Sequence, residues 1–206
     1  MTVTYSDLGL YAFALLILFL TPGPVWLAML ARSLSGGFKA AWPLALGVVV
    51  GDVLWSLLAI LGVSWIVSEF EGFLTVLRWV AVGMFLVMGA LLIRHADKQI
   101  AADSRLTRPG MWAGFVAGLV VILSNPKAIL FYMGFLPGFF DLSGLRLPDI
   151  VAICGISAVV PLVGNLILGA SIGAVRKIMT APKALRRMHI SAGCLLIFVA
   201  LILPFV

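Results

Sequence analysis

The feature that most limits how this chain can fold is a succession of long apolar stretches separated by short clusters of charged residues. A helix needs about 20 apolar residues to cross the hydrocarbon core of a bilayer, and these stretches have that length. Hydrophobic residues make up 63% of the chain and charged residues 11%, against roughly 25% charged residues in soluble domains. The period-2 alternation that is typical of a barrel strand is absent. We therefore expect an all-α integral membrane protein with six transmembrane helices, at approximately 8–31, 40–64, 73–93, 112–136, 149–174 and 188–205.

The basic residues predict how these helices are oriented. The connections at 32–39, 94–111 and 175–188 carry two, four and five Lys or Arg residues, whereas those at 65–72 and 137–148 carry one between them. Because cytoplasmic connections are enriched in Lys and Arg, we expect the first, third and fifth connections in the cytoplasm and both termini on the outer side. The net charge of +6 then reflects basic residues that orient the protein in the lipid bilayer, and no nucleic acid partner is expected.

The two halves of the chain resemble each other. "LILFLTPGPVWLAML" in the first predicted span and "VVILSNPKAILFYMG" in the fourth share an apolar run, a small hydroxyl residue, a proline break and an apolar continuation. Gly51 precedes Asp52 in the second span, and Gly164 precedes Asn165 in the fifth. Because a three-helix unit crosses the membrane an odd number of times, its second copy is inverted, as in many secondary transporters. We expect a single membrane domain, 1–206, with repeat one at 1–93, a cytoplasmic connection at 94–111 and repeat two at 112–206.

Prolines predict that the first and fourth helices are broken. Pro22-Gly23-Pro24 interrupts the first span, and Asn125-Pro126 interrupts the fourth. Proline lacks an amide hydrogen and obstructs a carbonyl one turn earlier, so backbone carbonyls are freed before each break. Within a bilayer such groups are tolerated where they line a cavity or are buried by protein. We expect the two breaks to meet near the midplane and form a site for a carboxylate and an ammonium, although a simple packing kink is the alternative.

Polar residues within the spans are the other candidates for this site. An acid at the centre of a span costs about 2.5–3.5 kcal/mol unless it faces a partner or water. We expect Asp52 to exchange a proton or bind substrate, and Asn165, at the matching position of the second repeat, to be a fixed hydrogen-bonding wall. Lys127 follows the second break. It takes part in transport, forms a static pair with Asp52, or caps the freed carbonyls, and the sequence leaves these alternatives open.

The motifs "LTPGPVWLAML", "ALGVVVGD" and "LSNPKAILFYMGFLPGFFD" resemble those of the LysE/RhtB family of amino-acid exporters, in order and spacing. The resemblance covers essentially the whole chain. It implies secondary active export of amino acids or their derivatives across a bacterial inner membrane, driven by the proton motive force and without a cofactor. The site residues that it implies are Pro22, Gly23, Pro24, Gly51, Asp52, Asn125, Pro126 and Lys127.

The chain also departs from the family pattern. Val25 stands where many members have Asn or Asp, Gly138 stands where many have Gln, and the third span lacks the usual tyrosines. These losses of polar groups favour a larger or less polar substrate.

Two other functions are weaker alternatives. A divalent metal exporter would favour His, Cys or several carboxylates within the spans, but His95 and His189 lie near span ends and Asp52 is the one deep acid. A membrane enzyme would need a nucleophile with a base, or clustered carboxylates, and the sequence indicates neither. We therefore expect a small-molecule substrate, protons and the bilayer as partners, no metal site, and small-residue helix faces that would allow a homodimer.

Overall fold

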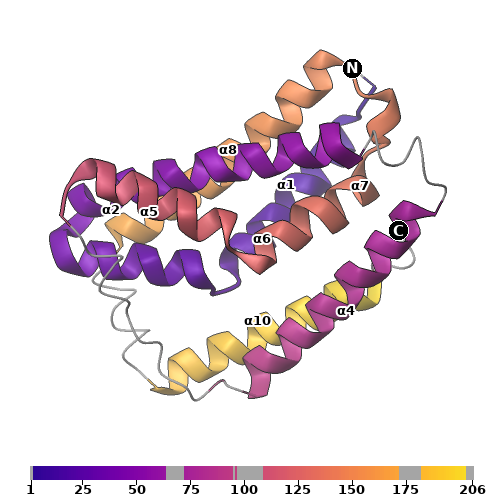
Figure 1. Ribbon diagram of the computed structural model, residues 1–206. Coiled ribbons are helices and arrows are strands. Elements are labelled where there is room, and N and C mark those ends of the chain that lie inside the picture. The colour runs from indigo at the N-terminus through magenta and orange to yellow at the C-terminus, as the bar shows by residue number, and fades with distance from the viewer. Residues whose placement is uncertain (1, 64–71, 95, 97–108, 172–181, 203–206) are drawn as a thin grey trace.

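In the computed structural model, residues 2–63, 72–94, 96, 109–171 and 182–202 are described, and every regular element among them is helical (Figure 1). The elements are α1 (Tyr5–Leu20), α2 (Pro24–Leu58), the π-helix η1 (Ala59–Val63), α4 (Phe73–Arg94), α5 (Met111–Leu123), α6 (Pro126–Leu130), the π-helix η3 (Phe131–Phe135), α7 (Leu136–Phe139), the 3-10 helix η4 (Leu142–Gly144), α8 (Leu147–Ala170) and α10 (Pro182–Ile202).

The helices agree with an integral membrane protein. By length and apolar composition, two helices in the described ranges can cross a bilayer, Pro24–Gly62 and Leu147–Ala170. The pair Met111–Leu123 and Pro126–Phe135 makes a third if it is counted as one span bent by 52°. The arrangement of six spans as two inverted repeats stays a prediction.

The first connection differs from the one that the sequence predicts. Residues 32–39 were expected to form a loop, but α2 is helical on both sides of a bend at Gly36 and Gly37. Gly37 has φ 67° and ψ −164°, a conformation that glycine adopts without steric cost. The bend therefore folds α2 into two arms, 24–35 and 38–58, which lie side by side (Figure 1).

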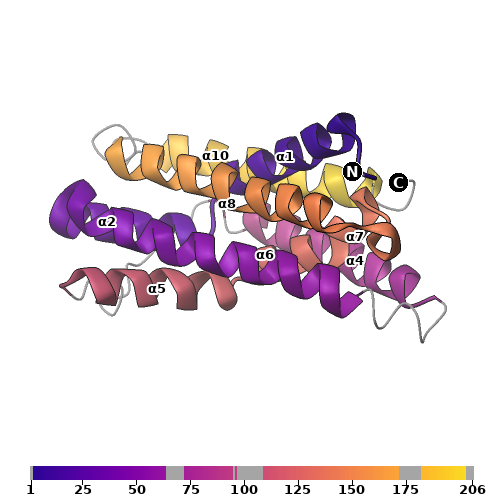
Figure 2. The ribbon, with the colours of Figure 1, turned by 90° about the horizontal axis from the view of Figure 1, so that it is seen from above.

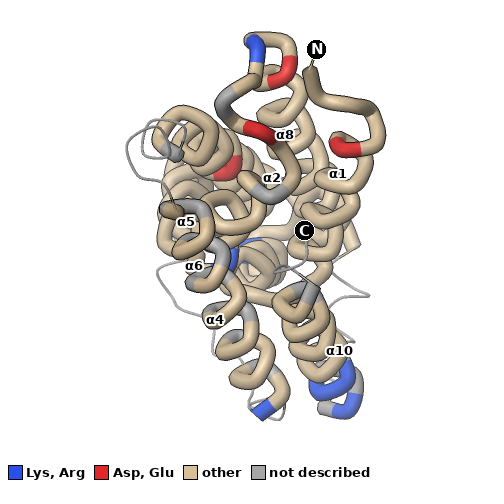
Figure 3. Tube along the Cα trace, turned by 90° about the vertical axis from the view of Figure 1, so that its right-hand side faces the viewer, with Lys and Arg blue, Asp and Glu red and all other residues tan. Residues whose placement is uncertain are grey.

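The charge pattern is described only in part. Most residues of the connections that we expect at 65–72, 94–111 and 175–188 lie outside the described residues. Among those described, the Lys and Arg residues of α4 and α10 lie at the ends of these helices, and few charges lie along their lengths (Figure 3). This distribution is compatible with helices that cross apolar surroundings.

The helices pack as one larger group and one pair. α5 and α8 pack against α2 and α1 packs against α8, whereas α4 and α10 lie alongside each other at one side of this group (Figures 1 and 2). The pair joins the group through a small apolar cluster of Val82, Leu130, Leu196 and Ala200. The larger core, around Tyr11, lies where α1, α2, α6, η3 and α8 meet.

Glycines bring α2 and α5 into backbone contact. A Cβ atom on Gly47 would collide with the carbonyl oxygen of Phe115, and one on Gly118 would collide with that of Leu44. Close approach of backbones is how small residues hold membrane helices together. This contact fixes α5, and therefore the break that follows it, against the second arm of α2.

The same contact leads to a prediction about stability. Replacing Gly47 with Ala is expected to lower the melting temperature of the detergent-purified protein. Overpacking costs about 1–3 kcal/mol, and each kcal/mol corresponds to about 2–4 °C for a chain of this size. Gly155→Ala is the matched control, because Gly155 also lies inside a helix but a Cβ there meets nothing within 4 Å. Equal melting temperatures of the two variants would contradict the backbone contact.

The start of the chain is tied to the start of α8. Asp149 is fully buried, and its carboxylate accepts hydrogen bonds from the backbone amides of Thr2 at 3.0 Å, Val3 at 3.2 Å and Arg146 at 3.0 Å. A carboxylate at the N-terminus of a helix is also favoured by the helix dipole. This contact sets α1 beside α8.

Candidate functional site

Both predicted helix breaks are present. α1 ends at Leu20, and α2 begins with Pro24 after the N-cap residue Gly23. α5 ends at Leu123, and α6 begins with Pro126 after the N-cap residue Asn125. In each case proline occupies the first position of the new helix. A residue at that position makes no helical hydrogen bond through its amide, so the missing amide hydrogen of proline costs nothing there. The helical interruptions that the sequence predicts at Pro22-Gly23-Pro24 and at Asn125-Pro126 are therefore confirmed.

The carbonyls freed at the first break are capped by side chains. The Lys127 ammonium donates to the carbonyl oxygens of Leu18 at 2.7 Å and Thr21 at 2.5 Å. The Trp26 indole donates to the Phe19 carbonyl at 2.6 Å. Of the three alternatives for Lys127, carbonyl capping is the one that the structure shows. Because Lys127 belongs to α6, this contact also joins the two breaks.

The second break is capped in a similar way. The Trp55 indole donates to the carbonyl of Ile122 at 3.3 Å, and the Ser124 hydroxyl donates to that of Val120 at 2.7 Å. The Asn125 side chain accepts from the Lys127 amide at 3.2 Å and so begins α6. Each break thus has one tryptophan whose indole donates to a carbonyl at the end of the preceding helix.

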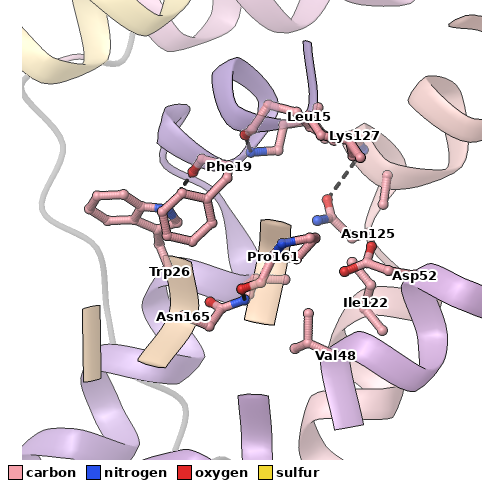
Figure 4. Close-up of a pocket in the computed structure, with 13 residues that line it drawn as sticks. Leu15, Phe19, Trp26, Val48, Asp52, Ile122, Asn125, Lys127, Pro161 and Asn165 are labelled. Carbon is pink, nitrogen blue, oxygen red and sulfur yellow. Dashed lines mark hydrogen bonds between the residues drawn. The ribbon is translucent and has the colours of Figure 1, made fainter. Parts of the chain in front are cut away.

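A cavity of about 40 Å³ lies between the two breaks (Figure 4). It has room for about two or three water molecules. Four of the predicted site residues line it, Asp52, Asn125, Lys127 and Asn165. Its remaining lining is apolar and consists of Leu15, Leu18, Phe19, Val25, Trp26, Val48, Ile122, Ala128 and Pro161.

The other predicted site residues shape the backbone around this cavity. Gly51 packs against Ile122, where a larger residue would collide with the isoleucine side chain. Pro24 and Pro126 begin the second halves of the broken helices, and Pro22 and Gly23 lie in the first break. None of these five glycines and prolines lines the cavity.

Asn165 carries an unused hydrogen-bond acceptor beside the cavity. Its side chain is 1% exposed, and its amide nitrogen donates to the Pro161 carbonyl at 2.9 Å. The Oδ1 atom of Asn165 makes no hydrogen bond to any described residue. Because buried polar atoms are nearly always paired, this oxygen is suited to a donor that a ligand supplies.

Asp52 is the buried acid of the site, with 3% of its surface exposed. Its carboxylate points toward the space between the breaks, near Asn125 and Ile122 (Figure 4). The Ser56 hydroxyl, one turn later on α2, donates to the Asp52 backbone carbonyl at 2.9 Å. The Tyr132 side chain of η3 faces the Asp52 carboxyl. No ion pair between Asp52 and Lys127 forms among the described residues, so the alternative of a static Asp52–Lys127 pair is not the arrangement found here.

Sequence reasoning missed several residues around Asp52. Tyr132, Tyr11 and Ser157 are fully buried and converge from η3, α1 and α8. Ser56 could have been found from the sequence, since it lies four residues after Asp52 on one helix face. No local signal places Tyr132 beside Asp52, because the two residues belong to different helices and only the packing of η3 against α2 brings them together.

Arg32 does not line the cavity but joins three helical segments near the bend of α2. Only 2% of its surface is exposed. Its guanidinium donates from Nε to the Ala40 carbonyl at 3.1 Å and from Nη2 to the Gly110 carbonyl at 2.7 Å. These bonds connect the first arm of α2 to the second arm and to the start of α5. Arg32 was expected in the connection at 32–39, but it lies within the helical first arm of α2, so this placement is wrong.

Comparison with known proteins identifies similar chains. The family described as LysE type translocator matches residues 16–205. An uncharacterized membrane protein, slr1627, of Synechocystis is 29% identical over 203 residues, which are 98% of each chain. A leucine efflux protein of Salmonella typhimurium is 29% identical over 133 residues, which are 65% of this chain and 63% of that protein. No solved structure matches.

Proposed function

Because the chain belongs to the LysE type translocator family, we propose that it exports amino acids through the cavity between its two helix breaks, driven by the proton motive force. The resemblance that the motifs predicted is confirmed by the family match. The family and the leucine efflux relatives indicate a multi-pass membrane transporter rather than an enzyme. A bacterial inner membrane with both termini outside is part of the proposal.

The observation that carries the proposal is the convergence of complementary polar groups on one buried cavity. Asp52 and the unpaired Oδ1 of Asn165 supply acceptors for a substrate ammonium. The Asn125 amide nitrogen points toward the same space and is suited to a carboxylate (Figure 4). An amino acid carries an ammonium and a carboxylate bonded to the same carbon atom, and acceptors and a donor that line one cavity match this pair of charges.

The rest of the lining favours an apolar side chain. Phe19, Trp26, Val48 and Ile122 surround the polar groups, and Val25 adds a further apolar surface. Asp52 is the one acid among the lining residues, and binding the ammonium of the substrate occupies it. A second charge on a substrate side chain would therefore be desolvated without a partner. Neutral, aliphatic amino acids such as leucine fit this lining, in agreement with the name of the leucine efflux relatives.

The cavity is too small for such a substrate in the conformation described. About 40 Å³ holds water but not an amino acid, so the helices must separate to admit one. Export then proceeds by alternating access, in which repeat one and repeat two rock about the two breaks. Lys127, which links the breaks, moves with α6 during this change.

Transport in proteoliposomes tests the proposal. Under an imposed proton gradient, leucine is expected to accumulate and Mn²⁺ is not expected to move. Lysine is expected to move at least about tenfold more slowly than leucine, because the charge on its side chain lacks a partner in the cavity. Empty liposomes are the control. Movement of the metal alone, or of no amino acid, would contradict an amino-acid exporter.

A further inference from the structure

The hydroxyl of Tyr132 is a buried polar group that the substrate site does not use. Tyr132 is 0% exposed, and its hydroxyl makes no hydrogen bond within the part of the chain that the structure describes. It faces the Asp52 carboxyl and the Ser157 hydroxyl. It lies in the π-helix η3, an element that occurs often at functional sites. A buried, unpaired hydroxyl beside an acid calls for an explanation.

Hydroxyl groups continue beyond Tyr132, away from the cavity. The Tyr11 hydroxyl lies 2.6 Å from that of Ser157, and Ser157 donates to the Ile153 carbonyl at 2.8 Å. Because Ser157 uses its one hydrogen on that carbonyl, Tyr11 donates to Ser157 in this arrangement. Tyr132, Ser157 and Tyr11 thus form a series of neighbouring hydroxyls that starts at Asp52.

This series points toward a second cavity. The Tyr11 ring packs against Phe139 and Phe140, with ring centroids 5.8 Å and 5.3 Å apart. Both phenylalanines also line a cavity of about 370 Å³ at the end of the molecule where the chain begins. We call this cavity the vestibule, and its other lining residues are Thr2, Val3, Asp7, Asp141, Gly144 and Leu145.

We propose that Tyr132, with Ser157 and Tyr11, carries the coupling proton between the vestibule and Asp52. This inference rests on the proposed function. Each hydroxyl accepts a proton from the vestibule side and passes its own proton toward Asp52. The Asp52 carboxylate gains one proton, and the vestibule loses one. Each hydroxyl keeps one hydrogen throughout and regains its first orientation by rotating about its C–O bond. The rings of Phe139 and Phe140 lie between Tyr11 and the vestibule, so they must shift before a proton enters.

The other groups around Asp52 are less suited to this path. Lys127 faces Asp52 from α6, but its ammonium donates to two carbonyls of the first break. Ser56, on the same helix as Asp52, donates to its own backbone. Cys154 of α8 lies near Tyr11. Tyr132 therefore holds the one hydroxyl next to Asp52 whose hydrogen is uncommitted among the residues described.

Tyr132→Phe tests this path. The change removes a hydroxyl that makes no hydrogen bond and keeps the ring, so the melting temperature is expected to stay unchanged. Infrared difference spectra after a pH jump report protonation of Asp52, whose band is assigned with Asp52→Asn. In Tyr132→Phe that protonation is expected to slow by roughly a hundredfold, within the range that a positioned proton-transfer group contributes. Tyr5→Phe, at a tyrosine that is 87% exposed, is the matched control.

A second measurement separates this inference from the proposed function. Leucine exchange between the two sides of liposomes at equal pH needs no net proton transfer, so Tyr132→Phe is expected to keep it while losing gradient-driven uptake. Protonation at the wild-type rate in Tyr132→Phe, or a wild-type Asp52 band that does not respond to pH, would overturn the path. Absence of any leucine movement, with slowed Asp52 protonation in the variant, would instead reject the proposed function and leave the path standing.

Discussion

Asp52→Asn is expected to abolish gradient-driven accumulation of leucine while the protein still folds. Asparagine has the same shape and keeps an oxygen acceptor, but it cannot bind and release a proton. Removing the acid also removes the energetic cost of burying a charge, which is about 2.5–3.5 kcal/mol on the insertion scale, so folding is not weakened. Uptake into proteoliposomes with and without a pH gradient measures the effect. The ratio of the two rates is expected to fall to about one.

A charge-matched control accompanies this variant. Asp103→Asn makes the same change in the connection that the sequence places at 94–111, away from the predicted spans, and is expected to transport normally. If Asp52→Asn retained gradient-driven accumulation, Asp52 would be a structural residue and the coupling site would lie elsewhere. Preserved leucine exchange at equal pH would show that substrate binding survives without the acid.

Lys127→Met is expected to destabilise the protein and stop transport. Methionine keeps the apolar stem but leaves the Leu18 and Thr21 carbonyls without their donor. Each buried, unpaired group costs about 1–3 kcal/mol, so the loss is about 2–6 kcal/mol for the pair. At about 2–4 °C per kcal/mol, the melting temperature falls by at least about 4 °C.

The exposed Lys183 provides the control for this change, since Lys183→Met on α10 removes the same charge without uncapping a carbonyl. The two variants are compared by thermal unfolding in detergent and by leucine uptake. A melting temperature of Lys127→Met equal to that of Lys183→Met would show that the carbonyls find other donors. The role of Lys127 in joining the breaks would then be refuted.

Local sequence signals account for the breaks and for much of the helical pattern. Proline acts on the carbonyl one turn earlier, so Pro22, Pro24 and Pro126 predict both interruptions from their positions alone. The bend at Gly36 and Gly37 was expected as a longer loop, because Arg32 and Lys39 resemble the flanks of a cytoplasmic connection. The first arm of α2 stays helical up to Gly36, four residues beyond the point at which Arg32 suggested that the helix ends. Arg32 is therefore buried, and its guanidinium connects the two arms of α2 and the start of α5.

Hydropathy and proline stereochemistry act within a few residues, so they are sufficient to predict the helical membrane class, the two breaks, and an acid and an amide within the spans. Which donor caps which carbonyl depends on the packing of the helices. Lys127 reaches Leu18 across 109 positions of the chain, and Tyr11 reaches Ser157 across 146. Such pairings depend on how whole helices pack, through contacts such as those of Gly47 and Gly118, and no local pattern encodes the result.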